Sequence, residues 1–292
     1  PWLPVWLMAL ALPVAAYRSA TGGVSTGALT AMAVPRGDRR SAVAINRAAS
    51  NAGFVIGPLL GALVSTWSYD ALFVLDGLAV LAIRVALSRT LPREEPTAAV
   101  DTAPRPGLWR AVRTDRSLLV LLVGVVLVDI VYRQLYSTLP LHLRDSGAPV
   151  GLYASVIAVG SGLILLLEIP ATQRLRRRSA YPVIATGYAL VGVGTAMFGL
   201  PVTALSVVAA MAVLTAGEIL YKTTATAHVL DAAPDHLVGQ YQGLYTGAAT
   251  SGTMLAAPIG TVIYDASPGL LWPVMGATAV VAAGFVVASG RS

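Results

Sequence analysis

The 292-residue chain is 56% hydrophobic and only 12% charged, with a mean hydropathy of +0.72. A soluble domain of this size carries about a quarter charged residues, so the composition excludes a soluble globular protein and predicts an integral membrane protein. The net charge of +6 comes from arginines in loops between apolar runs, which is typical of a membrane protein rather than of a nucleic-acid-binding surface.

A helix needs about 20 predominantly apolar residues to cross a bilayer. The apolar runs show no sustained alternation of polarity, which favours helices over a transmembrane barrel. We therefore predict an all-α integral membrane protein with about nine transmembrane helices. In chain order the predicted spans are 5–34, 42–67, 71–87, 117–143, 152–171, 181–200, 202–226, 238–264 and 270–289.

The long polar connection at 88–116 divides these spans into three and six. We predict that it is a cytoplasmic linker between the remainder of an N-terminal bundle (1–87) and a C-terminal six-helix bundle (117–292). Arginines gather in the loops after spans one, three and five, and the positive-inside rule places those loops in the cytoplasm. Because this puts Pro1 outside, and the chain does not begin with Met, we expect upstream spans to be missing. The expected location is the cell (plasma) membrane, with a multi-pass topology.

The second span carries a face made of glycine. Gly53, Gly57 and Gly61 recur every fourth residue, so on a helix they share one face and permit close approach of another helix. Pro58 removes a backbone donor beside this face and is expected to bend the helix. We interpret the segment as a packing and gating element; the alternative is a generic GxxxG packing face.

Proline spacing indicates an internal repeat. Pro35 and Pro58 are 23 residues apart, and Pro234 and Pro258 are 24 residues apart, with Gly260 following the last proline. Spans one to three thus match spans seven to nine, and parallel repeats are a transporter architecture. The simplest completion is two halves of six helices with the first three absent. The alternative is chance spacing of the prolines.

The segment Gly53–Gly61 resembles the antiporter motif in the fifth helix of the major facilitator superfamily (MFS), within its drug:proton antiporter branch. The segment Arg18–Gly22 resembles a motif of the family's fourth helix, in which an Arg precedes a glycine. Two positions depart from the family pattern: Ala62 replaces a second glycine, and Thr21 replaces a usual Gln. Weaker resemblances to the seventh, tenth and eleventh helices lie at 132–141, 217–218 and 239–243.

The resemblance implies an MFS-type helical bundle whose nine spans are family helices 4–12. It also implies a secondary active transporter that works by alternating access and couples the efflux of small organic molecules to proton entry. Direction, substrate and coupling ion follow from the resemblance alone. The alternative is a truncated, non-transporting membrane protein, such as a scaffold or sensor with the same fold.

Ionisable residues inside the spans are candidate cavity residues, because a charge at mid-bilayer costs about 2.5–3.5 kcal/mol on insertion scales. The resemblance implies a part in proton coupling for Arg18, which stays charged and would tune a carboxylate; a structural hydrogen bond is the alternative. A proton-coupled carrier needs a buried carboxylate, and Glu168 and Glu218 are the best candidates. Lys222, one turn after Glu218, could hold that carboxylate ionised, whereas Glu168 could lie near the wet interface.

A second group of polar residues lies in the fourth span. Asp129 and Arg133 are one turn apart, so they either neutralise each other or face a cavity. Tyr132 and Tyr136 flank this pair, and together these residues could line a substrate path.

The remaining expectations concern chemistry and partners. The chain has no Cys and only three scattered His, with no nucleophile–His arrangement and no glycine-rich phosphate loop, so neither an enzyme nor a metal or other cofactor is expected. The expected partners are a small-molecule substrate, protons and the lipid bilayer. We expect no nucleic acid, and a monomer.

Overall fold

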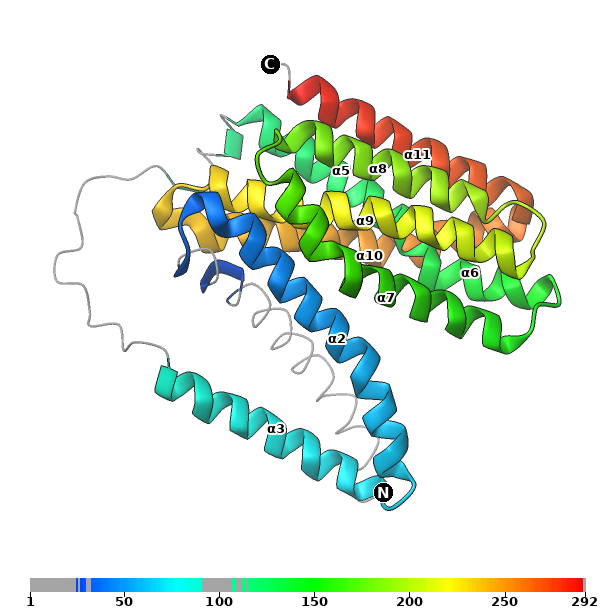
Figure 1. Ribbon diagram of the computed structural model, residues 1–292. Helices are drawn as coiled ribbons and strands as arrows, with labels where there is room; N and C mark the ends of the chain where they lie inside the picture. The colour runs from blue at the N-terminus through cyan, green and yellow to red at the C-terminus, as the bar shows by residue number, and fades with distance from the viewer. Residues whose placement is uncertain are drawn as a thin grey trace, which may run out of the picture.

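The computed structural model describes residues 25, 27–29, 33–90, 107–108, 112–113 and 115–290. Most of the predicted first span, including Arg18, and most of the predicted linker lie outside these residues. The described part folds into long α-helices and short 3-10 helices without a β-strand, so the all-α prediction is confirmed (Figure 1). The α-helices are α2 (Arg39–Ser65), α3 (Tyr69–Thr90), α5 (Arg116–Tyr132), α6 (Gln134–Asp145), α7 (Val150–Leu175), α8 (Ala180–Met197), α9 (Ala204–Ala232), α10 (Val238–Ala266) and α11 (Pro268–Ser289).

Five helical stretches in the described part are long and apolar enough to cross a membrane. They are Arg116–Asp145, Gly151–Leu175, Ala180–Met197, Ala204–Ala232 and Pro268–Ser289. Most predicted spans agree with the helices to within a few residues. One predicted end was wrong: the span at 202–226 continues as α9 to Ala232, where Arg39 of α2 donates to the carbonyl of Leu230.

The predicted span at 117–143 is also divided, because the helix is interrupted at Arg133 between α5 and α6. Arg133 has φ −72° and ψ −9°, and its carbonyl accepts hydrogen bonds from the amides of Tyr136 (3.0 Å) and Ser137 (3.2 Å). Gln134 follows the break and is fully buried, and its amide Nε2 donates to the carbonyl of Ala256 in α10 at 2.9 Å. The break therefore places Arg133 and Gln134 toward different neighbours.

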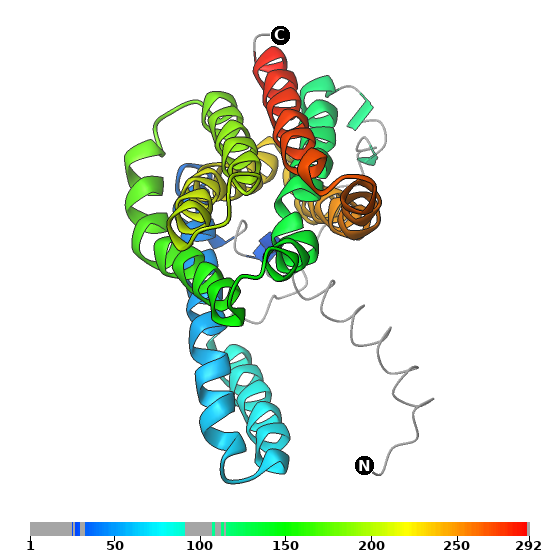
Figure 2. The same cartoon turned by 90° about the vertical axis from the view of Figure 1, so that its right-hand side faces the viewer.

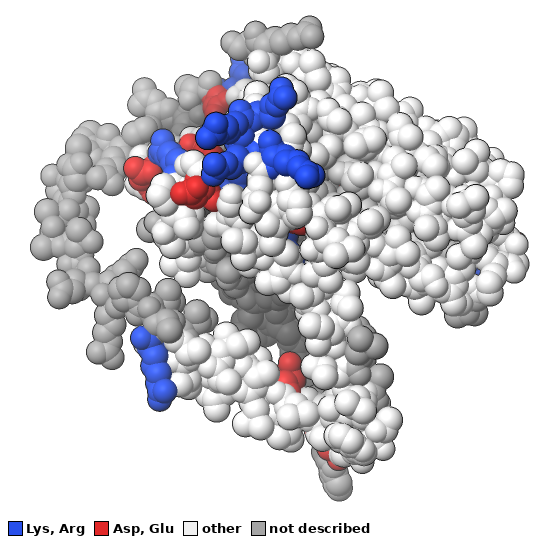
Figure 3. All heavy atoms as spheres, in the orientation of Figure 1, with Lys and Arg blue, Asp and Glu red and all other residues white. Residues whose placement is uncertain are grey.

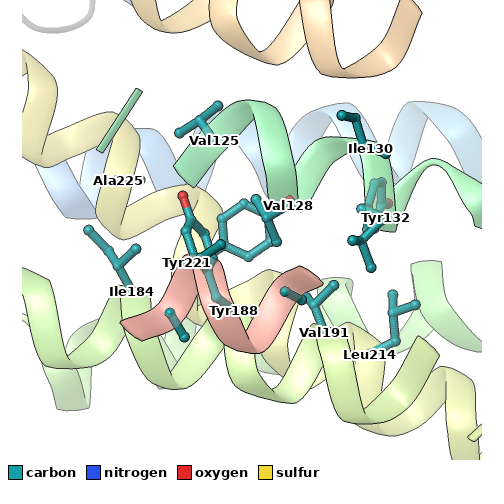
Figure 4. Packing of buried hydrophobic residues seen from close by; sticks show 14 of the residues in the cluster. Val125, Val128, Ile130, Tyr132, Ile184, Tyr188, Val191, Leu214, Tyr221 and Ala225 are labelled. Carbon is teal, nitrogen blue, oxygen red and sulfur yellow. The ribbon is translucent and has the colours of Figure 1, made fainter. Parts of the chain in front are cut away.

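The helices from α5 to α11 form one bundle whose closest contacts are made by glycines. A Cβ on Gly217 of α9 would lie 2.6 Å from the amide nitrogen of Val191, and a Cβ on Gly192 would lie 2.8 Å from the carbonyl oxygen of Gly276 in α11. Thus α8 lies almost in backbone contact with both neighbours. Figure 4 shows Tyr188 of α8 and Tyr221 of α9 in the apolar core, where their rings meet edge to face with centroids 5.1 Å apart.

Helix α2 contacts α7 and α9 along its first half and then diverges from the bundle, and α3 lies beside it (Figures 1 and 2). A Cβ added to Gly53, Gly57 or Gly61 would meet nothing within 4 Å among the described residues. The helix continues through Pro58 without interruption. Close packing on this glycine face therefore stays a prediction, since its partner is not among the described residues.

The two turns that contain the repeated prolines have the same local structure. Pro35 (φ −56°, ψ 151°) precedes the 3-10 helix η1 (Arg36–Asp38), and Pro234 (φ −57°, ψ 144°) precedes η2 (Asp235–Leu237). Each proline carbonyl accepts a hydrogen bond from the third residue after it, at 2.9 Å and 2.8 Å. Long helices of 27 and 29 residues follow these turns, so the local pattern that the prolines mark occurs twice. The three-span repeat inferred from the proline spacing stays a prediction, because most of the first span lies outside the described residues.

Basic side chains gather at one end of the described molecule, where α2 begins (Figure 3). We call this the arginine-rich end and define it by Arg36, Arg39, Arg40, Arg174 and Arg178. Arg40 donates to the carbonyl of Leu175, the last residue of α7, at 2.7 Å. Arg39 also contacts the carboxylate of Asp231 at 3.5 Å, so α2 is tied here to the ends of both α7 and α9. The cytoplasmic location of this end and the three-part division of the chain stay predictions.

Candidate functional site

A cavity of about 390 Å³ lies where α2 crosses the bundle. We call it the α2 cavity, because α2 forms one wall and the helices α5 to α7 and α9 form the others. Its lining residues are Arg47, Ser50, Asn51, Phe54, Tyr132, Arg133, Tyr136, Ile157, Ser161, Glu218 and Lys222. Beyond this level α2 departs from the bundle: Leu60 and Leu63 are 55% and 52% exposed. The cavity therefore lies between the tied arginine-rich end and the divergent end of α2.

Four charged side chains from three helices meet at this cavity, and we call them the charge cluster. Arg47 of α2 contacts two carboxylates: its Nε lies 3.3 Å from Oε1 of Glu168 on α7, and its Nη2 lies 3.3 Å from Oε1 of Glu218 on α9. Lys222, one turn after Glu218, lies 3.0 Å from the same Oε1. The cluster thus contains two cations and two carboxylates, and Arg47 is the residue that joins all three helices.

Both glutamates are removed from solvent: the side chain of Glu168 is 0% exposed and that of Glu218 is 5% exposed. The hydroxyl of Thr223 donates to Oε1 of Glu168. In each glutamate the second oxygen, Oε2, is buried and has no hydrogen-bond partner among the described residues. Each carboxylate therefore uses one oxygen for its ion pair and leaves the other with free lone pairs, where a proton can be held without displacing a partner.

An aromatic wall continues from the charge cluster. The ammonium of Lys222 lies 3.6 Å from the ring centroid of Tyr132, and the guanidinium of Arg133 lies 5.9 Å and 5.7 Å from the rings of Tyr132 and Tyr136. The two tyrosine hydroxyls are 3.4 Å apart. These are cation–π distances, so both cations are held against aromatic faces at the cavity wall.

The structure brings together most of the residues that the sequence nominated. Tyr132, Arg133, Tyr136, Glu218 and Lys222 line one cavity. Glu168 lies directly behind it, in contact with Arg47. The alternative that Glu168 lies near the wet interface is not observed, because its side chain is 0% exposed and in contact with Arg47 and Thr223. The roles of these residues in transport stay predictions.

Asp129 does not line the cavity. It is 5% exposed and lies where α5 meets α10, so that a Cβ on Gly252 would be 2.8 Å from its Cβ. Among the described residues Asp129 and Arg133 form no direct ion pair, although the amide of Arg133 still donates to the carbonyl of Asp129 at 2.9 Å. The charges of Lys222 and Arg133 nevertheless act on the buried carboxylate of Asp129 through space.

The packing residues predicted in α10 lie on this same side. Pro258 is inside the helix, and Gly260 faces the side-chain amide of Gln134, where a Cβ would overlap that amide. Gly260 is therefore at a close contact between α10 and α6, in contrast to the open face of Gly53, Gly57 and Gly61.

Sequence reasoning missed Arg47, the residue at the centre of the charge cluster. It lies only five residues inside the predicted span at 42–67, close to an arginine-rich loop. Its spacing becomes informative only once the contacts are known: Arg40 and Arg47 are seven residues apart on α2, and their α7 partners Leu175 and Glu168 are seven apart in the opposite direction. Seven residues are two helical turns, so both arginines lie on the face of α2 that packs against α7.

The sequence of this chain is similar to a family of known membrane proteins. The sequence model of the Major Facilitator Superfamily matches residues 2–257. The uncharacterized MFS-type transporter YttB of Bacillus subtilis is 27% identical over 237 residues, which cover 79% of this chain and 59% of that protein. The uncharacterized MFS-type transporter YhjO of the same organism is 23% identical over 219 residues, covering 74% and 53%. The chain thus spans about half the length of the curated relatives that it matches.

Proposed function

Because the chain belongs to the Major Facilitator Superfamily, we propose that it transports a small organic molecule across a membrane by alternating access and couples this transport to protons. Family membership and the relatives named as transporters support the transport part of the proposal. The resemblance of Gly53–Gly61 to the antiporter motif supports efflux driven by proton entry. The charge cluster supports proton coupling.

The observation that carries the proposal is the link that Arg47 makes from α2 to both α7 and α9. With both glutamates ionised, this one guanidinium attracts two carboxylates and holds α2 against the bundle. A proton on Oε2 of Glu168 removes one of these anions and weakens the attachment of α2 to α7. Since α2 belongs to the first half of the chain and α7 and α9 to the second, protonation would bias their relative position.

The position of α2 supports one particular state of the cycle. At the arginine-rich end α2 is tied to the ends of α7 and α9, and beyond Phe54 it diverges from them (Figure 1). If the arginine-rich end faces the cytoplasm, as the positive-inside rule predicts, the α2 cavity opens outward. An outward-facing cavity next to the charge cluster is where an external proton would enter in proton-driven efflux.

Proteoliposomes test this proposal. The chain is reconstituted into liposomes that contain a pH-sensitive dye. Three naphthalene compounds are then added in turn: the anion naphthalene-2-sulfonate, the neutral naphthalene-2-sulfonamide and the cation (naphthalen-2-ylmethyl)trimethylammonium. We expect at least one of them to move together with protons, and Glu168→Gln to abolish the proton signal.

The matched control is Asp265→Asn, an exposed carboxylate at the end of α10, which should leave the proton signal unchanged. Absence of proton movement with all three compounds would contradict proton-coupled transport. An undiminished signal in Glu168→Gln would show that protons do not pass through the charge cluster.

A further inference from the structure

The charges that line the α2 cavity are unequal. Its lining contains three cations, Arg47, Arg133 and Lys222, and one carboxylate, Glu218. Glu168 balances Arg47 from behind the wall, and Glu218 balances Lys222. These pairings leave Arg133 as the cation of the cavity lining that has no direct ion pair among the described residues, although the buried carboxylate of Asp129 attracts it at longer range.

Arg133 has no ion pair and no side-chain hydrogen bond among the described residues, and its Nε is buried without a partner. Its guanidinium instead lies over the ring faces of Tyr132 and Tyr136. Asp129, the nearest carboxylate along the chain, is buried against α10 instead. Arg133 as a whole is half-buried and lines the cavity. An anionic ligand in the cavity would supply acceptors for its N–H groups, which is favourable within a membrane span.

Lys222 adds a second donor for an anion. Its ammonium has three N–H groups, and one of them donates to Glu218. The ammonium also lies over the ring of Tyr132. It lines the same cavity as Arg133, so both cations can be reached by a ligand in that space. A planar or tetrahedral oxyanion suits such a pair, because guanidinium binds it through two parallel hydrogen bonds and ammonium binds it as a point charge.

The rest of the lining is suited to an apolar body. Phe54 of α2 is 76% exposed and Tyr136 of α6 is 49% exposed, and both line the cavity together with Ile157. Large exposed aromatic side chains around a cavity, with a few polar groups to fix orientation, are typical of sites for small organic ligands.

We propose that the α2 cavity selects organic anions, in which a carboxylate, sulfonate or phosphate group binds Arg133 and Lys222 and an aromatic or apolar body lies against Phe54 and Tyr136. This inference rests on the proposed transport function and specifies its substrate class. An organic cation of the same shape would instead meet the unpaired charge of Arg133.

Binding measurements without a proton gradient test the inference. Isothermal titration calorimetry is carried out on the full 292-residue chain in lipid nanodiscs, with empty nanodiscs as the blank and naphthalene-2-sulfonate as the probe. The neutral sulfonamide and the trimethylammonium compound are the charge-matched comparisons. We expect the sulfonate to bind at least about tenfold more tightly than either, because a hydrogen bond to a charged group contributes about 1.5–3 kcal/mol and 1.4 kcal/mol corresponds to tenfold.

Arg133→Gln should lower the affinity for the sulfonate about tenfold or more and remove the preference for it, and Arg133→Lys should restore part of both. The matched control is Arg144→Gln near the end of α6, whose side chain is 71% exposed and paired with Asp145 at 2.8 Å; it should bind like the unaltered chain. Equal or tighter binding of the ammonium compound overturns the inference, as does unchanged sulfonate binding by Arg133→Gln. If Arg133→Gln does not fold, the ranking of the three compounds on the unaltered chain decides.

These results separate the inference from the proposed function. Sulfonate binding without proton movement in proteoliposomes would contradict proton coupling and leave the anion site standing. Proton movement with the ammonium compound, together with no sulfonate binding, would contradict the anion site alone.

Discussion

Replacing Arg47 by Gln removes the cation that Glu168 and Glu218 share. Glu218 keeps Lys222 at 3.0 Å, but Glu168 loses its ion pair and retains only the hydroxyl of Thr223. The side chain of Glu168 is 0% exposed in the unaltered chain, and the shorter, neutral Gln cannot supply the positive charge that is lost. Removing one member of a buried ion pair costs about 3–5 kcal/mol, and we expect Arg47→Gln to lower the apparent free energy of unfolding by this amount.

A double-mutant cycle measures this effect by chemical denaturation in detergent. Adding Glu168→Gln to Arg47→Gln removes the stranded carboxylate, so the double variant should be more stable than Arg47→Gln alone, with a coupling energy of about 0.5–3 kcal/mol between the two positions. The control is Arg36→Gln, which breaks an exposed pair with Asp235 and should change stability little. A loss below about 1 kcal/mol for Arg47→Gln, or strictly additive effects of the two substitutions, would refute the reasoning.

Three glycine substitutions and one arginine substitution test the packing of the helices. Gly217→Ala should destabilise the bundle by about 1–3 kcal/mol, because the new Cβ would lie 2.6 Å from a backbone nitrogen of α8. Gly284→Ala in α11 has open space among the described residues and should not, and thermal unfolding compares the two variants. Gly57→Leu should abolish transport while leaving sulfonate binding intact, and normal transport by this variant would contradict the predicted packing role of the glycine face. Arg39→Gln should raise hydrogen–deuterium exchange at the end of α9, because Arg39 donates to the carbonyl of Leu230 there. Unchanged exchange at this end would contradict the attachment of α2 to α9.

Hydrophobicity and local turn chemistry made much of the fold predictable. Long apolar runs specify helices wherever they cross a membrane, and the pair of Pro35 and Pro234 gave the same turn twice because proline fixes φ in each. The interruption at Arg133 could not be predicted in this way. It depends on contacts made after folding, including the hydrogen bond from Gln134 to Ala256, more than 120 residues along the chain.

The candidate site was predictable in its membership but not in its pairing. Single ionisable residues in apolar runs, such as Glu168 and Lys222, stand out because they are costly to insert. Their partners are set by how helices pack, and Arg47 meets Glu168 only because α2 and α7 lie side by side. The sequence pair Asp129 and Arg133 was the more obvious neighbour relation, yet the two side chains form no direct ion pair in the described part of the folded chain, because Asp129 is buried against α10.

We predict that protonation of the charge cluster changes the position of α2 relative to the bundle. The chain has no Cys, so spin labels can be attached at introduced cysteines in exposed positions. Double electron–electron resonance then measures two distances between labels as the pH is lowered. The first joins Gly37→Cys and Arg177→Cys at the arginine-rich end, and the second joins Leu63→Cys and Ser146→Cys at the opposite end. We predict that acidification lengthens the first distance and shortens the second, and that Glu168→Gln fixes both at their acidic values. Distances that do not change with pH, or that change equally in Glu168→Gln, would contradict the claim.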